Sequence, residues 1–216
     1  MKLLKTGIAG LDEFLTGGLP PRVLLLVGLP GAGNEVFARQ IAYNRAKQNG
    51  TTYFIVNETA DSVRDDMAVY NWDLAPLEES GNWKFKVIAK KADLQEAIIG
   101  EMSQHRTVII DSISELLLTR EIGEVIDLLT AMSKKNKDGD DYHLLLLTEG
   151  MQDSKAETAM QHFAEGVIIF TSTWTTDTLH TDILIKKMKG TFVPARRLPY
   201  SISKRGFLIE TATRIT

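Results

Sequence analysis

The sequence predicts an α/β protein with a mostly parallel sheet that is flanked by helices. Short, continuous apolar runs alternate with helical patterns up to about residue 165, which is typical of parallel strands that are buried on both faces. Beyond that point the expected strands follow one another with only turns between them. This second pattern predicts C-terminal antiparallel hairpins that extend one end of the sheet. We expect residues 1–216 to form a single domain.

The elements are predicted from the same two patterns. The apolar runs predict strands at Val23–Val27, Thr52–Val56, Trp83–Ile88, Thr107–Ile110, His143–Leu147 and Gly166–Phe170. The segments between them predict helices near 35–48, 62–70, 93–104, 121–135 and 155–163. Asp93 followed by Glu96 resembles a capping box and marks the start of the third helix. The later strands are expected near 166–173, 180–188, 199–202 and 206–209.

The composition limits the function. The 216 residues carry a net charge of −3, so no overall attraction draws the chain to nucleic acid or to a membrane. The absence of cysteine excludes disulfides, thiol catalysis and zinc–thiolate sites. The four histidines are far apart in the sequence, so we expect no metal site. No apolar run reaches the length of about 18 residues that a membrane span needs, and we expect a cytoplasmic protein without a membrane partner.

The stretch after the first predicted strand has the frame of a phosphate-binding loop. Such a loop reads G-x-x-x-x-G-K-[ST] and leads from a strand into a helix. Gly28 and Gly33 have the required spacing, and Gly31 lies between them. Asn34 stands in the place of the lysine, and Glu35 stands in the place of the hydroxyl residue. These five residues are the candidates for contact with a nucleotide, in a loop with an altered Walker A sequence.

The two replacements disfavour a bound polyphosphate. In a working loop, the lysine neutralises the β- and γ-phosphates and the hydroxyl holds Mg²⁺. Asn34 carries no charge. Glu35 would place a carboxylate beside the phosphates, and two like charges about 4 Å apart cost on the order of 4 kcal/mol at an effective dielectric of about 20. Without the ligand, the same carboxylate complements the helix dipole by roughly 0.3–1 kcal/mol. The loop therefore suits an empty site better than an occupied one.

Segments along nearly the whole chain resemble the KaiC-type members of the RecA-like ATPases. Residues 5–20 are similar to the family's opening motif with paired glycines, and residues 184–191 are similar to its L-K-x-R-G-[TS] motif. Less specific matches lie at residues 57–59, 70–73 and 108–112. The resemblance implies a RecA-like P-loop NTPase fold, with ATP and Mg²⁺ as the ligands of an intact site.

The resemblance also implies roles for residues at two strand ends. Asn57 occupies the place of the glutamate that polarises the attacking water, so Glu58 is the remaining carboxylate of the usual pair. An amide cannot accept a proton as a general base does. Glu58 is therefore the catalytic candidate, and a residue at a helix entry is the alternative interpretation. Asp111 matches the strand-end aspartate that orients Mg²⁺ through water.

Two lysines match positions that act on a neighbouring subunit in the family. Lys187 and Lys189 match the lysine and the arginine of L-K-x-R-G, which the family places at a neighbour's phosphates. Lysine is a point charge without the bidentate fork of arginine. A pair of exposed lysines on a strand explains the same two residues without any contact in trans.

A basic segment near the C-terminus supports an alternative function. Arg196, Arg197, Lys204 and Arg205 lie on either side of Tyr200. Basic residues together with aromatic ones can bind single-stranded nucleic acid. A solvated strand edge that charge protects from further pairing is the simpler interpretation.

The altered positions Asn34, Glu35 and Asn57 together predict that ATP hydrolysis is lost and that no cofactor is bound. The chain would then be a regulatory, signalling or scaffold subunit whose partner is a second copy or an active RecA- or KaiC-type ATPase. Trp174, in a polar run, is expected either in the core or against that partner. Two alternatives stay open: weak ATP binding or hydrolysis through backbone amides and Asp111, and single-stranded DNA binding as in RecA and RadA paralogues. We expect a monomer or a dimer.

Overall fold

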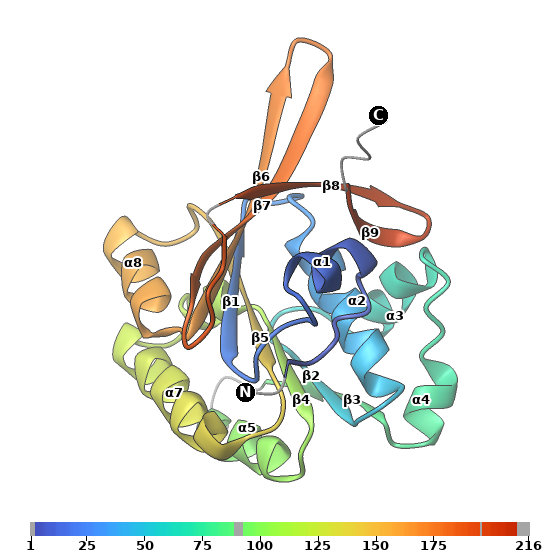
Figure 1. Cartoon of the computed structure of the whole chain (residues 1–216). Coiled ribbons are helices and arrows are strands. Elements are labelled where there is room, and N and C mark those ends of the chain that lie inside the picture. Colours follow the sequence, from blue (N-terminus) through green and yellow to red (C-terminus); the bar gives the residue numbers. More distant parts are fainter. Residues whose placement is uncertain (1–2, 89–92, 195, 211–216) are drawn as a thin grey trace.

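The computed structural model describes residues 3–88, 93–194 and 196–210. These residues form a nine-stranded mixed sheet with helices packed on both of its faces (Figure 1). The α/β class, with a mostly parallel sheet and antiparallel strands toward the C-terminus, is confirmed.

Parallel strands form the larger part of the sheet. In spatial order they are β3 (Trp83–Val87), β2 (Thr51–Ile55), β4 (Thr107–Asp111), β5 (His143–Thr148), β1 (Val23–Gly28) and β6 (Gly166–Thr175). The antiparallel strands continue from β6 and are β7 (Thr178–Met188), β8 (Arg197–Ser203) and β9 (Gly206–Ile209). The strand that precedes the glycine loop therefore lies inside the sheet, between β5 and β6.

Alternate residues of β1 face two separate cores. Leu24 and Leu26 belong to the core on one face of the sheet, and Val23, Leu25 and Val27 belong to the core on the other face. Every residue of this strand is buried. Because both faces are covered, the strand appears in the sequence as an unbroken apolar run rather than as an alternating one.

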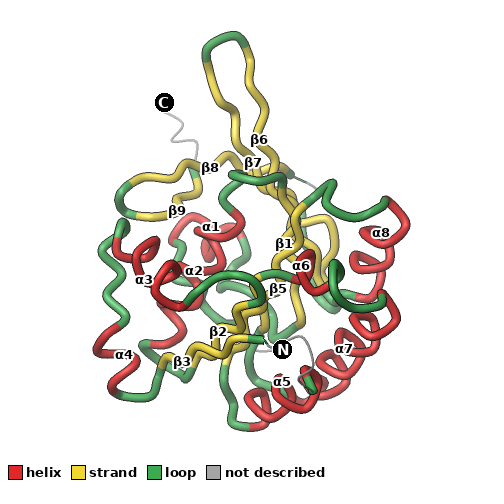
Figure 2. Tube along the Cα trace, turned by 180° about the vertical axis from the view of Figure 1, so that it is seen from behind, coloured by secondary structure: helices red, strands yellow, loops and turns green. Residues whose placement is uncertain are grey.

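The helices form a layer on each face of the sheet (Figures 1 and 2). Residues of α1 (Ala9–Phe14), α2 (Asn34–Ala46), α3 (Ala60–Ala68) and α4 (Ala75–Glu79) pack against the first core. The second core is formed with α5 (Leu94–Ser103), α6 (Ile113–Leu116), α7 (Ile122–Lys135) and α8 (Ser154–Phe163). A 3₁₀ turn, η1 (Asn136–Asp138), follows α7.

Strands β6 and β7 extend beyond the rest of the sheet as a two-stranded arm (Figure 1). Their pairing continues to Thr175 and Thr178, whereas β8 pairs with β7 only at residues 182–184. Trp174 and Leu179 lie opposite each other on the arm, and they are 71% and 44% exposed. Trp174 is therefore outside the core, where the other two tryptophans are buried.

The predicted strands and helices are all present, whereas the short helices α1, α4 and α6 were not predicted. The N-cap at Asp93 is confirmed, because its Oδ1 accepts the N–H of Glu96 at 3.0 Å. In the part of the chain that the structure describes, no helix has the length and apolar character needed to cross a membrane. The single domain and the cytoplasmic location stay predictions.

Candidate functional site

The glycine loop joins the end of β1 to the start of α2. Gly31 and Gly33 have φ values of +79° and +84°, a left-handed conformation that glycine adopts without the clash of a Cβ atom. Gly33 directly precedes α2, and the first backbone N–H groups of a helix have no intrahelical partners. The loop therefore has the backbone form of an anion-binding turn.

Gly28 and Asn34 pack closely at the base of this loop. A Cβ atom on Gly28 would lie 3.1 Å from Cβ of Ala32 and 3.2 Å from Oδ1 of Asn34. Asn34 is only 3% exposed. The amide that stands in the place of the lysine is thus packed against the strand end and does not extend into solvent.

A pocket of about 400 Å³ lies between the start of α2 and the carboxyl ends of β2, β4 and β5. Asn34 and Glu35 line it from α2, Asn57 and Glu58 line it after β2, and Asp111 lines it at the end of β4. The structure therefore brings together the loop residues and the strand-end residues that the sequence singles out.

One buried arginine, Arg39, pairs with three carboxylates of this pocket. Its guanidinium nitrogens lie 2.6 Å from Oδ2 of Asp66, 3.1 Å from Oε2 of Glu58 and 3.6 Å from Oδ2 of Asp111. Burial alone would lower the pKa of Arg39, but the facing Tyr53 and Asp111 raise it, and the net shift is upward. The guanidinium therefore stays charged.

Tyr53 and Arg39 together hold the strand-end aspartate. The Tyr53 hydroxyl donates a hydrogen bond of 2.5 Å to Oδ2 of Asp111 and accepts one of 3.2 Å from Nε of Arg39. Tyr53 is fully buried and stacks on Trp83. The aspartate that the resemblance assigns to Mg²⁺ is thus bonded within the chain.

Negative charge exceeds positive charge in this pocket. Its lining combines Arg39 with the carboxylates of Glu35, Glu58, Asp66, Asp111 and Glu115. Burial raises the pKa of Asp111, and burial together with the charge of Asp111 raises the pKa of Glu35 and of Glu115. A further negative charge in this space is therefore disfavoured. Within the described ranges, no group of three or more His, Asp or Glu residues is arranged to hold a metal ion.

Both carboxylate oxygens of Glu58 have partners within the chain. Oε2 accepts a hydrogen bond from Arg39, and Oε1 accepts one of 2.7 Å from the Ser62 hydroxyl. Ser62 belongs to the first turn of α3, whose N-cap is Thr59. Glu58 is therefore part of the start of this helix, as its alternative interpretation expects, and Asn57 beside it is exposed.

The β8–β9 hairpin packs on the glycine loop and on α2. The Tyr200 hydroxyl donates a hydrogen bond to the carbonyl oxygen of Ala32. The side-chain amide of Gln40 accepts from the N–H of Phe207 at 2.6 Å and donates to its carbonyl at 3.3 Å. Ile202 packs so closely on Gly33 that a Cβ atom there would lie 2.4 Å from Cδ1 of Ile202 and would require that side chain to move. The conformation of the loop is thus fixed both by its own glycines and by its contacts with the C-terminal hairpin.

Lys187 lies in β7, and Lys189 lies in the turn that follows it. Both lie beside the start of β6, at the amino ends of the parallel strands, whereas the glycine loop lies at the carboxyl end of β1. Nζ of Lys187 donates to the carbonyls of Gln161, His162 and Ala164 at 3.3, 2.7 and 2.7 Å. Burial, and then the charge of Lys189, lower the pKa of Lys187. Lys187 therefore caps the end of α8, whereas Lys189 is exposed. Contact of either lysine with a neighbouring subunit stays a prediction.

The four basic residues near the C-terminus are not gathered in one patch. Arg196 and Arg197 lie at the start of β8, and Lys204 and Arg205 lie in the turn after its end. At about 3.3 Å per residue, the extended strand separates the two pairs by about 20 Å. Tyr200 between them is 2% exposed. It is therefore not available to stack on a base, which removes one support of the nucleic-acid alternative.

Four residues in or beside the pocket at the start of α2 were not predicted from the sequence: Arg39, Tyr53, Asp66 and Glu115. One signal for Arg39 was available, because it follows Glu35 by four residues and such a pair lies on the same face of a helix. The others come from different elements, so only the tertiary fold brings them to the pocket.

A strand, a glycine loop and a helix in direct succession form the phosphate-binding unit of P-loop proteins. Here that unit starts from a strand in the middle of a parallel sheet, with an aspartate at the end of β4, which places the molecule in their RecA-like class. The sequence profile of the KaiC family of ATPases matches residues 4–214, and the chain belongs to this family.

Relatives of known sequence and structure agree with this assignment. A UPF0273 protein of Pyrococcus horikoshii is 25% identical over 95% of this chain and 93% of its own length. A UPF0273 protein of Thermotoga maritima is 25% identical over 97% of this chain and 96% of its own length. The crystal structure of a KaiC-like protein of Pyrococcus horikoshii gives a TM-score of 0.82 at 25% identity, and the match covers 97% of this chain and 99% of that one.

Proposed function

We propose that this KaiC-like protein does not hydrolyse ATP and acts as a regulatory, signalling or scaffold subunit through a protein partner. The observation that carries the proposal is the set of ion pairs between Arg39 and the carboxylates of Glu58, Asp66 and Asp111. Two of these contacts engage, within the chain, Asp111, which the family would direct at Mg²⁺, and Glu58, the remaining carboxylate of the usual pair. The pocket thus has its own internal cation.

The residues present do not fit Mg²⁺–ATP. Asn34 is buried and uncharged, and Glu35 lines the same pocket with a pKa that is already raised by burial and by Asp111. A phosphate charge about 4 Å from Glu35 costs on the order of 4 kcal/mol at an effective dielectric of about 20. The loop supplies neither the lysine that neutralises phosphate nor the hydroxyl that holds the metal. We therefore assign no hydrolytic step to this site.

Weak nucleotide binding is the second candidate, and the backbone of the loop favours it. Gly31 and Gly33 keep the left-handed conformation, and the N-terminus of α2 follows them. Backbone N–H groups at such a position attract anions without help from side chains. In this case Asp111 would have to exchange its contacts with Arg39 and Tyr53 for a metal-bound water.

Two exposed features support action through a partner. Trp174 and Leu179 form an apolar pair on the arm of β6 and β7, away from both cores. Lys189 is exposed at the amino ends of the parallel strands. At the matching position, the family places a cation that contacts the adjacent subunit. A second copy of the chain or an active RecA- or KaiC-type ATPase would be the partner.

Thermal unfolding with millimolar Mg²⁺–ATP, with Mg²⁺–ADP and without nucleotide tests the proposal. A ligand at about 100 times its Kd adds roughly 2.7 kcal/mol to a folded state that it binds exclusively. For a protein of this size, that energy raises Tm by roughly 5–10 °C. We expect no shift for the natural sequence and a shift of several degrees for the double variant Asn34→Lys with Glu35→Thr.

A matched double variant separates the loop from overall charge. Asn82→Lys with Glu79→Thr changes the net charge by the same amount at a site away from the loop, and we expect no nucleotide shift for it. A clear shift for the natural sequence would replace the proposal by weak nucleotide binding. An unchanged affinity in the loop variant would show that the electrostatic interpretation of Asn34 and Glu35 is wrong.

A further inference from the structure

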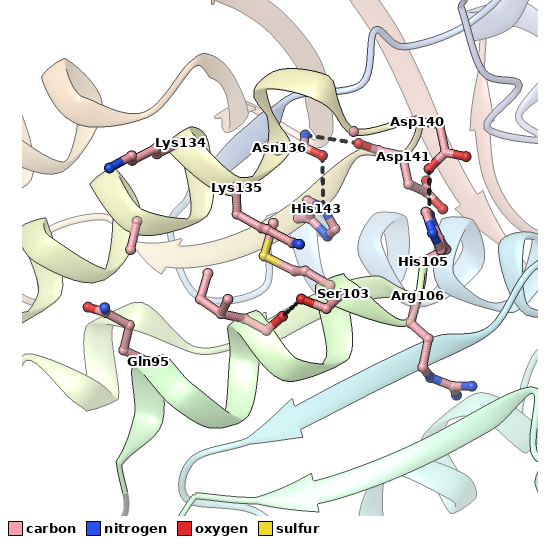
Figure 3. Close-up of a pocket in the computed structure, with 14 residues that line it drawn as sticks. Gln95, Ser103, His105, Arg106, Lys134, Lys135, Asn136, Asp140, Asp141 and His143 are labelled. Atoms are coloured by element: carbon pink, nitrogen blue, oxygen red, sulfur yellow. Dashed lines mark hydrogen bonds and ion pairs between the residues drawn. The ribbon is translucent and has the colours of Figure 1, made fainter.

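A second pocket lies between α5 and α7, at the amino ends of β4 and β5 (Figure 3). Its volume is about 590 Å³, which is within the range of roughly 300–1,000 Å³ that is typical of small-molecule sites. It shares no lining residue with the pocket around Arg39. Ligands of open α/β sheets usually bind at the carboxyl ends of the strands, so this pocket is separate from the nucleotide region.

Part of the lining of this pocket is apolar or neutral, and its buried cation, Arg106, is paired with Glu101 at 3.3 Å. Ile99 and Met102 line it from α5, and Ala131 lines it from α7. His143 lines it from the start of β5; its Nδ1 accepts the N–H of Val108 at 3.1 Å. Burial lowers the pKa of His143 to about 4. The imidazole is therefore neutral near pH 7 and adds no charge to the wall.

One of the two acidic residues of the lining is paired with a cation inside the chain. Oδ2 of Asp141 lies 2.7 Å from Nη2 of Arg45 and accepts a further hydrogen bond of 2.7 Å from the Thr107 hydroxyl. Asp140, at the rim, lies 3.5 Å from Nδ1 of His105. Asp141 therefore leaves no unbalanced negative charge at the pocket, whereas Asp140 is exposed to solvent and forms an ion pair only when His105 is protonated.

Two lysines at the end of α7 supply positive charge at the rim. Lys134 and Lys135 are both exposed, and neither has an ion pair within the residues that the structure describes. Figure 3 shows the ammonium group of Lys135 extending toward Ser103 and His143, whereas Lys134 extends away from them. Lysines in the last turn of a helix complement its dipole. That role accounts for the charge, but not for the apolar cavity beside it.

We propose that this pocket binds a small amphipathic anion, which is a carboxylate, sulfonate or phosphate group on an apolar or aromatic body. Lys135 pairs with the anionic group, and Ile99, Met102 and Ala131 contact the apolar body. Ligand sites usually combine apolar side chains with polar groups that orient the ligand, and the lining of this pocket contains both. The proposal does not depend on the state of the glycine loop.

Fluorescence titration of the full chain with 1-anilinonaphthalene-8-sulfonate, an aromatic sulfonate, tests this site. We expect saturable binding to the natural sequence. Lys135→Glu is expected to weaken binding at least about tenfold, because it replaces the pairing cation by a like charge. Ala131→Leu is expected to weaken binding at least about fivefold, because the larger side chain fills the cavity. Octanoate is expected to displace the dye, whereas octanol and inorganic phosphate at equal concentration displace much less.

Lys137→Glu is the matched control. Lys137 is an exposed lysine two residues further along the chain and does not line the pocket, so this variant is expected to bind the dye within twofold of the natural sequence. If Lys135→Glu and Lys137→Glu lose the same affinity for the dye, the loss comes from the change in overall charge and not from a specific contact, and the proposal is overturned. Unchanged binding in Ala131→Leu, or no saturable binding at all, would also overturn it. Urea unfolding of each variant verifies that it is folded during the titration.

Discussion

At the scale of single residues, Arg39 determines the charge balance at the strand ends. Its guanidinium is the shared partner of Glu58, Asp66 and Asp111, which belong to or follow separate elements. A buried cation of this kind neutralises carboxylates whose mutual repulsion would otherwise oppose folding. The same contacts that we assign to the loss of nucleotide chemistry therefore also contribute to stability.

Replacing Arg39 by methionine tests this stabilising role. The variant keeps the aliphatic volume but leaves Asp111 buried without its cation, so we expect a loss of about 2–3 kcal/mol in the free energy of unfolding near pH 8. This expected loss is smaller than the loss from breaking a fully buried ion pair, because the side chains of Asp66 and Glu58 are 54% and 35% exposed. Burial already raises the pKa of Asp111, and an unpaired Asp111 binds a proton more readily in the folded state. The loss should therefore shrink as the pH falls toward 5, as urea unfolding at both pH values would measure.

Arg64 provides the comparison for this prediction. It also pairs with two carboxylates, those of Asp61 and Glu78, but its side chain is 39% exposed. Exposed ion pairs contribute roughly 0–1 kcal/mol, so Arg64→Met should cost no more than that. If the two variants lose equal stability, the ion pairs of Arg39 do not have the structural role that we assign to them.

His143 gives the protein a pH dependence of stability below neutrality. Burial lowers its pKa from 6.5 to about 4 in the folded state, so the unfolded chain binds a proton that the folded chain does not bind between these values. Stability from this group is present above pH 6.5 and is lost as the pH falls. The loss between pH 7 and pH 5 should be on the order of 2 kcal/mol. Urea unfolding should show a smaller pH dependence in His143→Asn, whereas a variant of the exposed His105 should behave as the natural sequence does.

Part of the site can be predicted from the sequence at this scale. It predicts which residues follow β1, β2 and β4, because glycines and acidic residues after apolar runs are local signals. It does not predict that Arg39 turns toward Asp66 or that Tyr53 donates to Asp111, because those contacts depend on the distance between α2, α3 and β4. The family resemblance adds expected roles, but it says nothing of residues outside the family's motifs.

At the scale of elements, Lys187 connects β7 to the end of α8. Its ammonium group donates hydrogen bonds to three carbonyl oxygens at the end of the helix. The last carbonyls of a helix have no partner within the helix itself. Charged donors at such an end also complement the helix dipole. The lysine that the resemblance assigns to a neighbouring subunit thus has a structural task in its own chain.

Replacing Lys187 by methionine should destabilise the protein by about 1–2 kcal/mol, since hydrogen bonds from a charged group are worth about 1.5–3 kcal/mol and this one is partly exposed. Hydrogen exchange should increase mainly in α8. Lys186→Met is the matched variant, because Lys186 makes one exposed hydrogen bond to the Gln161 side chain, and it should leave α8 unchanged. Equal effects of the two variants on α8 would argue against the capping role.

The helices that escaped prediction are short. The periodicity of apolar residues needs about 11 residues to be distinct, and α1, α4 and α6 have 6, 5 and 4. Pro76 lies in the first turn of α4, where its missing N–H is not needed. By contrast, α2 and α7 span 13 and 14 residues, and both were predicted.

At the scale of the whole molecule, continuous apolar runs predict that the sheet is parallel, but they do not give the order of its strands. The order follows from long-range packing, in which β1 lies between β5 and β6 and divides two cores. The two strands of the β6–β7 arm were predicted to within two residues at its tip, but the extension of the arm beyond β8 was not. The exposure of Trp174 is a property of that arm and not of its local sequence.

The central position of β1 has a consequence for synthesis of the protein on the ribosome. The 120 positions from Val23 to His143, its first partner in β5, are translated at about 5–20 residues per second, so β1 waits on the order of 10 s for a neighbour. During that interval a fully apolar strand is held in a nascent chain. The segment containing Tyr200 and Phe207, which fixes the glycine loop and α2, is translated later still, after both β5 and β6. The glycine loop therefore reaches its final form only after the β8–β9 hairpin, far downstream in the sequence, has been synthesised.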